Sequence, residues 1–247
     1  MIDLIDECSC DFLKMGYKKK KADKYGIELL SLHIKDESQS LESGFDIGDY
    51  YIINAPLVHY LDEESLNYLS LLLKKRLKFL IKKYNLSKAK TLIVGLGNPE
   101  IWADRLGIET CNSIDLLNLN NTVKICPNVY FETGIKTFDI VYSLVKNLNI
   151  KFVVLIDSLC TNSIARLGCS LQLTTTGMTP GSAVNSKSKR ICQKELHIPC
   201  FSLGVPFMIN AKTFGFNNEL LLCPKDIKQN IKNISYVLAK ALQEIIK

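Results

Sequence analysis

The chain has 247 residues, of which 47% are hydrophobic and 23% are charged, and its formal net charge is +6. This composition excludes a disordered chain, and the length suits one domain, residues 1–247. The modest, scattered positive charge does not indicate direct binding of nucleic acid. No stretch of about eighteen apolar residues is present and the N-terminus is acidic, so we expect a cytoplasmic protein with no membrane partner.

The first predicted elements are two strands and a long helix. Residues 27–34 and 50–54 are rich in β-branched and aromatic residues, and a turn region at 44–49 separates them, as is typical of a pair of strands. From 63 to 84, leucines recur at three- and four-residue spacing, which predicts an amphipathic helix. We interpret the lysines on its other faces as a solvated surface.

Two continuous apolar runs follow, at 91–97 and 152–156. Runs of this kind are typical of strands that are covered by helices on both faces. Helices are expected between and after the runs, and two more strands follow the second run. We expect the helices at 101–117, 136–148 and 225–246, and the strands at 169–174 and 198–204.

This alternation predicts an α/β fold with a mostly parallel sheet flanked by helices on both faces. In such folds the active crevice lies outside the carboxyl ends of the strands. That rule selects three loops, at 97–104, 157–162 and 174–190.

Two aspartates in the first two loops indicate acid-base chemistry. Asp157 directly follows the second apolar run, and Asp104 follows the turn after the first. A carboxylate at the end of a buried strand costs free energy unless it is paired, hydrogen-bonded or protonated. If the strands are neighbours, one carboxyl group can activate water while the other donates a proton to a peptide. Helix capping by Asp104 and a structural role for Asp157 are the alternatives.

The third loop is rich in hydroxyl groups and glycines and ends in basic residues at Lys187, Lys189 and Arg190. Its backbone amides could hold a peptide carbonyl or an oxyanion, and a solvated connection is the alternative.

Cofactor and metal sites are not expected. The turn Gly95-Leu96-Gly97 lacks the third glycine of a dinucleotide-binding fingerprint. The three histidines are far apart, and the nine cysteines form no C-x-x-C pair, so neither a zinc site nor a disulfide framework is indicated. Cys160 is interpreted as an inert neighbour of Asp157, with a redox sensor as the alternative.

Several short segments, colinear between Leu92 and Ala211, carry a resemblance to a known family. They include Val94-Gly95-Leu96-Gly97-Asn98 with Asp104 behind it, Ile156-Asp157-Ser158-Leu159 with Arg166 behind it, Thr176-Gly177, Pro180-Gly181-Ser182 and Gly204-Val205-Pro206. In this order they resemble the germination protease family of spore-forming Firmicutes.

The resemblance implies an endopeptidase of the spore core that hydrolyses small acid-soluble spore proteins during germination. The two essential aspartates of the family correspond to Asp104 and Asp157. The resemblance also implies a fold related to hydrogenase maturation endopeptidases, an atypical aspartic mechanism and a homotetramer. Four further residues would position the substrate or tune the pair, two of them through their backbone amides. They are Asn98, Arg166, Gly181 and Ser182.

The sequence also departs from the family pattern. Asp3, Leu4 and Glu7 resemble an N-terminal family stretch but lie almost at the first residue, so we expect most of the family's propeptide to be absent. Thr175 replaces the residue, usually acidic, that precedes the Thr-Gly pair in the family.

Two other functions remain open. One is a catalytically silent sporulation protein that binds or regulates, against which the presence of both aspartates argues. The other is a maturation endopeptidase that trims a metalloenzyme precursor, which the lack of clustered His and Glu near Asp104 and Asp157 disfavours.

Overall fold

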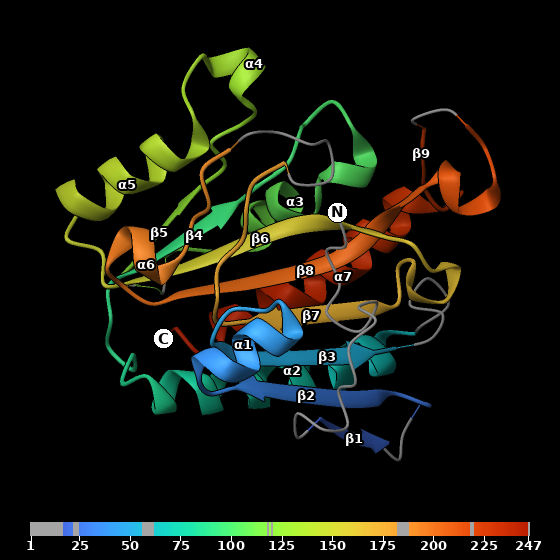
Figure 1. The fold of residues 1–247 in the computed structure, drawn as a ribbon. Coiled ribbons are helices and arrows are strands. Elements are labelled where there is room, and N and C mark those ends of the chain that lie inside the picture. Colours follow the sequence, from blue (N-terminus) through green and yellow to red (C-terminus); the bar gives the residue numbers. More distant parts are fainter. Residues whose placement is uncertain are drawn as a thin grey trace.

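The computed structural model contains one sheet with helices on both of its faces (Figure 1). It describes residues 17–21, 25–55, 62–117, 119, 121–181, 188–217 and 220–246. The strands are β1 (Lys18–Lys21), β2 (Glu28–Ile34), β3 (Gly48–Asn54), β4 (Thr91–Gly95), β5 (Thr122–Ile125), β6 (Phe152–Thr161), β7 (Ser170–Thr174), β8 (Cys200–Asn210) and β9 (Leu221–Leu222). The α-helices are α1 (Glu37–Ser43), α2 (Glu63–Lys83), α3 (Leu106–Ser113), α4 (Tyr130–Thr133), α5 (Thr137–Asn147), α6 (Gln193–Leu196) and α7 (Ile227–Gln243), and short 3-10 helices are η3 (Trp102–Asp104), η4 (Ile164–Arg166) and η6 (Ala211–Phe214).

Neighbouring strands follow the order β1-β2-β3-β7-β8-β6-β4-β5, and β9 pairs with β8. The strands β8, β6, β4 and β5 run parallel to one another. The remaining pairs are antiparallel, so β1, β2, β3 and β7 extend the parallel half with an antiparallel one, and β9 adds a short antiparallel pair to β8. The predicted α/β fold with flanking helices is confirmed, and its parallel part contains both apolar runs.

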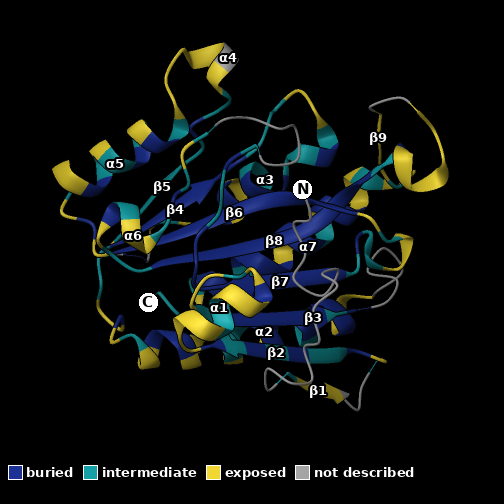
Figure 2. Ribbon diagram, viewed as in Figure 1, coloured by how far each residue is buried: buried dark blue, intermediate teal, exposed yellow. Residues whose placement is uncertain are grey.

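Each face of the sheet has its own core because alternate residues of a strand point to opposite faces. On one face, α2, α3 and α7 pack over Ile93 and Val154. On the other, α5 and α6 pack over Leu92 and Val153. Figure 1 shows α1, α5 and α6 in front of the sheet with α2 and α7 behind, and Figure 2 shows the central strands buried. This double cover explains why the runs are continuously apolar.

The long helix α2 is amphipathic, as its leucine spacing predicts. It begins after Asp62, whose side chain accepts a hydrogen bond from the Ser65 backbone N–H, a typical N-cap. Leu69, Leu73 and Leu77 are fully buried in the core beneath the helix. Burial of this leucine stripe therefore fixes α2 against the back of the sheet.

The structure differs from the sequence prediction in several elements: β8 is longer than expected, α1, α4, α6, β5 and β9 were not expected, and three further differences bear on the site or the sheet edge. The helix expected at 101–117 is divided into η3 and a shorter α3, with Arg105 between them. The strand expected at 152–156 continues to Thr161, because β8 also continues and keeps pairing with it. The lysine run that forms β1 has no apolar pattern and pairs with β2 at the edge of the sheet, where lysines discourage pairing with other chains.

Candidate active site

Asp157 lies inside β6, not at the end of a strand as the sequence predicts. It is the residue after Ile156, which makes the last pairing with β4, opposite Gly95. On the other side Asp157 remains in register with Gly204 of β8. The side chain is 9% exposed, and its Oδ1 accepts a hydrogen bond of 2.9 Å from the Ser158 N–H. Asp157 therefore lies one residue beyond the end of the pairing with β4, whereas the pairing with β8 continues past it.

Asp104 is the last residue of η3, in the loop that leaves β4. Its Oδ2 accepts a hydrogen bond of 2.8 Å from the Asn98 backbone N–H. Burial raises the pKa of Asp104 to about 6, although the hydrogen bond from Asn98 acts in the opposite direction. The protonated form is favoured because the surroundings solvate a charge poorly.

Gly97 allows η3 to fold back against the end of β4. Its φ is +126°, and a Cβ atom at this position would lie 1.8 Å from the Asp104 carbonyl oxygen. Every other residue type would collide with the turn and would also be strained at this φ. Gly97 therefore serves to position Asp104.

Contacts on both sides of each aspartate join the η3 turn to β6. The Leu96 N–H donates to the Ile156 carbonyl at 2.8 Å, and the Leu106 N–H donates to Ser158 Oγ at 3.4 Å. Ala103 packs in a small core cluster with Cys160 of β6 and Met208 of β8. The two aspartates thus belong to segments that pack directly against each other.

Two cations hold Trp102, the first residue of η3. The Arg105 guanidinium lies 4.3 Å from its ring centroid, and Lys228 of α7 lies 4.8 Å from it. Arg105 also donates to the Pro99 carbonyl at 3.2 Å and pairs with Glu109 at 2.6 Å. These contacts fix the turn that carries Asp104 against α3 and α7.

The other predicted site residues are placed as follows. Asn98 contacts Asp104 through its backbone, whereas its side-chain oxygen accepts from the Glu100 N–H at 2.9 Å. Arg166 ends η4, which follows the end of β6. Gly181 has a φ of +69°, and Ser182 lies outside the described residues, as does the predicted N-terminal stretch with Asp3 and Glu7.

Sequence reasoning missed a row of polar side chains on the face of the sheet that carries Asp157. Gln172 of β7 is in register with Gly204 and hence in one row with Asp157. Thr174 of β7 pairs with Ser202 of β8 in the next row on the same face, and both residues are buried. The Ser202 hydroxyl has no hydrogen-bond partner within the described structure. Polar and apolar residues alternate along β7, although the strand is buried throughout. This alternation in the sequence could have identified the polar row.

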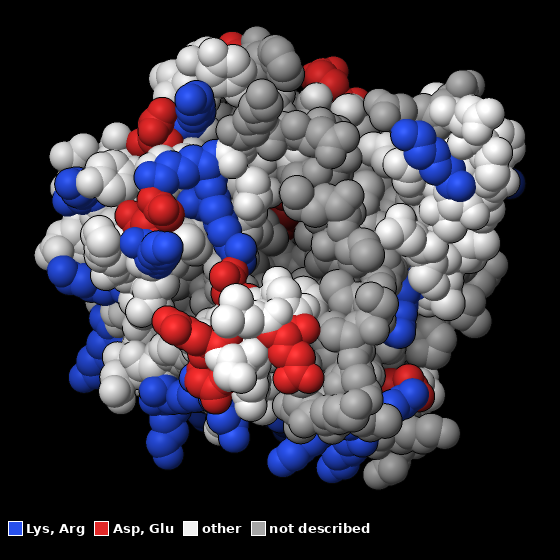
Figure 3. Space-filling view, in the orientation of Figure 1, with Lys and Arg blue, Asp and Glu red and all other residues white. Residues whose placement is uncertain are grey.

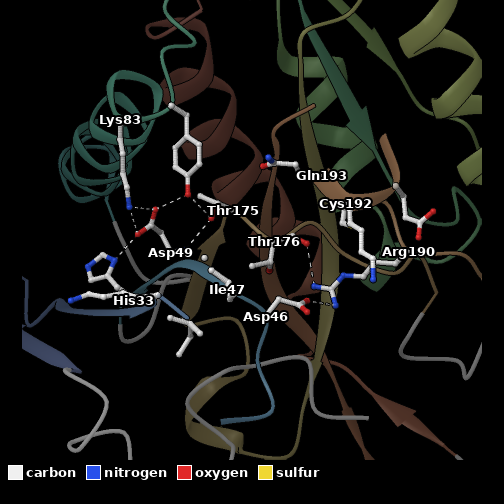
Figure 4. A pocket seen from close by; sticks show the side chains of 16 residues that line it. His33, Asp46, Ile47, Asp49, Lys83, Thr175, Thr176, Arg190, Cys192 and Gln193 are labelled. Atoms are coloured by element: carbon white, nitrogen blue, oxygen red, sulfur yellow. Dashed lines mark hydrogen bonds and ion pairs between the residues drawn. The ribbon is translucent and has the colours of Figure 1, made fainter. Parts of the chain in front are cut away.

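A separate cleft of about 1040 Å³ opens where β7 ends and β3 begins, and neither Asp104 nor Asp157 lines it (Figure 4). Asp49 belongs to the lining of this cleft, although it is only 1% exposed. The Asp49 carboxylate accepts hydrogen bonds from Lys83 at 2.7 and 2.8 Å, from His33 Nδ1 at 2.6 Å and from the Tyr84 hydroxyl at 3.0 Å. Burial raises the pKa of Asp49, but the bonds from Lys83 and His33 outweigh it and lower the pKa overall.

The cleft was not expected from the sequence because its residues come from segments that are distant along the chain. Lys83 was interpreted as part of a solvated helix face, and the structure corrects this: its ammonium group binds the buried Asp49.

Two features are absent from the residues that the structure describes. No group of three or more His, Cys, Asp or Glu side chains within them could hold a metal ion. No helix within them has the length and apolar character needed to cross a membrane.

Comparison with known proteins gives consistent matches. The model of a family described as germination protease matches residues 9–218. The chain is 33% identical to a germination protease of Oceanobacillus iheyensis, over 76% of this chain and 54% of that protein. It is 29% identical to those of Priestia megaterium and Bacillus subtilis, over 79% and 81% of this chain and 56% and 58% of those proteins. The chain thus spans little more than half the length of these relatives.

A solved structure is also similar in part. It is a [NiFe] hydrogenase maturation protease from Thermococcus kodakarensis, with a TM-score of 0.42 and 14% sequence identity. The match covers 66% of this chain and 99% of that one.

Proposed function

Because the chain belongs to the germination protease family, we propose that it is an atypical aspartic endopeptidase with Asp104 and Asp157 as its acid-base pair. The substrates are small acid-soluble spore proteins, hydrolysed in the spore core during germination. The whole chain acts as one α/β peptidase domain and assembles as a homotetramer, as the family resemblance implies.

The observation that supports this proposal is that burial raises the pKa of Asp104. Asp104 lies in a turn that packs against β6, the strand of Asp157. A carboxyl group with a raised pKa can act as the acid beside a second carboxyl group that acts as the base. Asp104, with its pKa near 6, is the group that carries the proton, and Asp157 is the carboxylate that accepts one.

Hydrolysis then proceeds in two steps. Asp157 removes a proton from water as the water oxygen attacks the peptide carbonyl carbon, and Asp104 donates its proton to the carbonyl oxygen. In the second step the C–N bond breaks as the proton held by Asp157 moves to the amide nitrogen, and one hydroxyl group of the intermediate returns its proton to Asp104 as the carbonyl re-forms. The hydrogen bonds from Asn98 N–H and Ser158 N–H hold one oxygen of each carboxyl group in place throughout.

Substrate contacts are assigned to residues around the pair. The row of Gln172, Thr174 and Ser202 supplies buried polar groups on the face of Asp157, where a peptide backbone needs hydrogen-bond partners. Arg166 and the amides of Gly181 and Ser182 complete the binding of the substrate.

The proposal is tested by incubating the purified chain with a small acid-soluble spore protein and analysing the products by mass spectrometry. Cleavage at discrete internal bonds is expected from the parent chain and from the control Asp139→Asn, which changes an exposed aspartate of α5. Asp104→Asn and Asp157→Asn are expected to leave the substrate intact. An inactive parent chain would favour the alternative, a silent binding or regulatory protein of the same fold.

A further inference from the structure

We propose that the cleft beside Asp49 binds an anionic ligand that carries carboxylate or phosphate groups. The cleft volume of about 1040 Å³ exceeds the needs of a single inorganic ion and suits a small molecule or a short peptide. Neither Asp104 nor Asp157 contributes to its lining. The cleft therefore lies outside the proposed acid-base pair, although Thr176 of its lining is hydrogen-bonded at 2.7 Å to Thr174, one of the proposed substrate contacts.

One wall of the cleft holds two nitrogen donors in place over a buried carboxylate. Lys83 and His33 both bind Asp49, whose side chain is 2% exposed, whereas their own side chains are 46% and 34% exposed. Asp49 thus anchors Lys83 and His33 from within the fold. Lys83 retains a further N–H, and His33 retains Nε2, which donates to an anion when the ring is protonated.

The opposite side of the cleft holds a second anchored cation (Figure 4). Arg190 pairs with Asp46 at 2.6 Å and donates to the Thr176 carbonyl at 3.2 Å, and its side chain is 41% exposed. A guanidinium group has five N–H donors, so these two bonds leave others for a ligand. Arginine, fixed in this way, favours carboxylate and phosphate groups, whose geometry matches its donors.

The acidic side chains that line the cleft are already neutralised. The pairs are Asp49 with Lys83, Asp46 with Arg190 and Glu195 with Lys189. Lys35 and Lys194 also line the cleft, and within the described part of the chain no acidic side chain pairs with either. Figure 3 shows basic side chains gathered over α6 and the segment before it, with acidic ones over α1 beside them. A positive excess thus remains for an anion, whereas a cation would meet no unpaired carboxylate in this lining.

The floor of the cleft is polar but uncharged. The hydroxyl groups of Thr175 and Thr176 lie on it, and Gln193 contributes an amide from α6 (Figure 4). The Thr175 hydroxyl already accepts from the Asp49 N–H at 3.0 Å and the Thr176 hydroxyl bonds that of Thr174 at 2.7 Å, so the Gln193 amide is the neutral group assigned to the uncharged part of a ligand.

Binding is tested by isothermal titration calorimetry of the full chain at low ionic strength. The probes are citrate, a free small anion, and a hexaglutamate peptide, with hexalysine as the control of opposite charge. Binding of citrate identifies a small molecule as the ligand class, and binding of hexaglutamate alone identifies an acidic peptide. Either result supports the proposal. Failure of both anions to bind, or equal binding of hexalysine, overturns it.

A pair of charge-matched variants locates the site. Lys35→Glu with Lys194→Glu is expected to weaken binding at least about tenfold, roughly the loss of one charge-assisted hydrogen bond. The control, Lys75→Glu with Lys232→Glu, makes the same charge change on exposed residues of α2 and α7 outside the cleft. Equal weakening by both pairs would contradict a site in the cleft.

The test also separates this inference from the proposed peptidase function. A chain with Asp104→Asn and Asp157→Asn is expected to bind the anion as the parent does. Loss of anion binding in that double variant, with the fold intact by circular dichroism, would contradict an independent site.

Discussion

Asp157 of β6 and Gly204 of β8 occupy the same register position, one residue beyond the last pairing between β6 and β4. On one side of Asp157 a strand has ended and the η3 turn takes its place. On the other side the neighbouring residue has no side chain of its own. The end of β4 thus coincides with a carboxylate in a ten-residue strand that is buried throughout, whereas the space beside Gly204 is filled by Leu159, which a Cβ atom there would meet at 2.7 Å.

The first prediction concerns Gly97, the residue that lets the η3 turn approach β4. Gly97→Ala places a Cβ atom where the Asp104 carbonyl oxygen lies and is strained at the φ of +126°. We expect the variant to lose peptidase activity by at least about tenfold and stability by about 1–3 kcal/mol. Cleavage rates and urea denaturation measure the two effects.

Gly134→Ala is the matched control for this change. Gly134 also has a positive φ, of +69°, but a Cβ atom there meets nothing within 4 Å. The control should lose some stability through strain and keep its activity. If Gly134→Ala lowered activity as much as Gly97→Ala, displacement of Asp104 would not be the cause.

The second prediction concerns the pH dependence of stability. The pKa of Asp104 is raised to about 6 in the folded chain, against about 3.9 for an unfolded aspartate. Its contribution to stability is therefore complete below about pH 4 and is lost as the pH rises through about 6. Asp104→Asn removes this loss of about 3 kcal/mol, so its stability should fall less than that of the parent between pH 4 and pH 8. Parallel pH profiles in urea denaturation would contradict the raised pKa.

The third prediction concerns Asp49. Its pKa is lowered by Lys83 and His33 despite burial, so its stabilising effect is present above the unfolded pKa and disappears as the pH falls through the lower, folded one. Asp49→Asn should destabilise the chain at pH 7 by about 1–3 kcal/mol. The difference from the parent should shrink in acid. Asp46→Asn, at the more exposed pair with Arg190, should cost less than about 1 kcal/mol.

The fourth prediction compares two leucines of α2. Leu73 is fully buried, whereas Leu71 is 41% exposed. Leu73→Ala should cost about 2–5 kcal/mol of unfolding free energy because it leaves a cavity, and Leu71→Ala about 0.5 kcal/mol. Similar losses from both, measured by urea denaturation, would mean that α2 is oriented differently against the sheet.

The sequence predicted the elements with a clear period, but not the surroundings of the two aspartates that it singled out. The leucine spacing of α2 and the apolar runs of β4 and β6 determine which faces are buried, and the structure confirms these elements. The length of β6 was underestimated because it depends on pairing with β8, a contact that is not local. The Asp49 cluster could not be predicted because a charged side chain such as Lys83 has the same local pattern whether its partner is water or a buried carboxylate.

The most direct test of the central claim is the initial rate at which Asp157→Asn cleaves a small acid-soluble spore protein, relative to the parent chain and to Asp139→Asn. General acid-base catalysis contributes roughly 100- to 10,000-fold to rates, and the amide keeps the shape of the carboxyl group. We predict a fall of about 100-fold or more in Asp157→Asn, with Asp139→Asn within about twofold of the parent. Cleavage by Asp157→Asn at the parental rate would contradict the assignment of the pair.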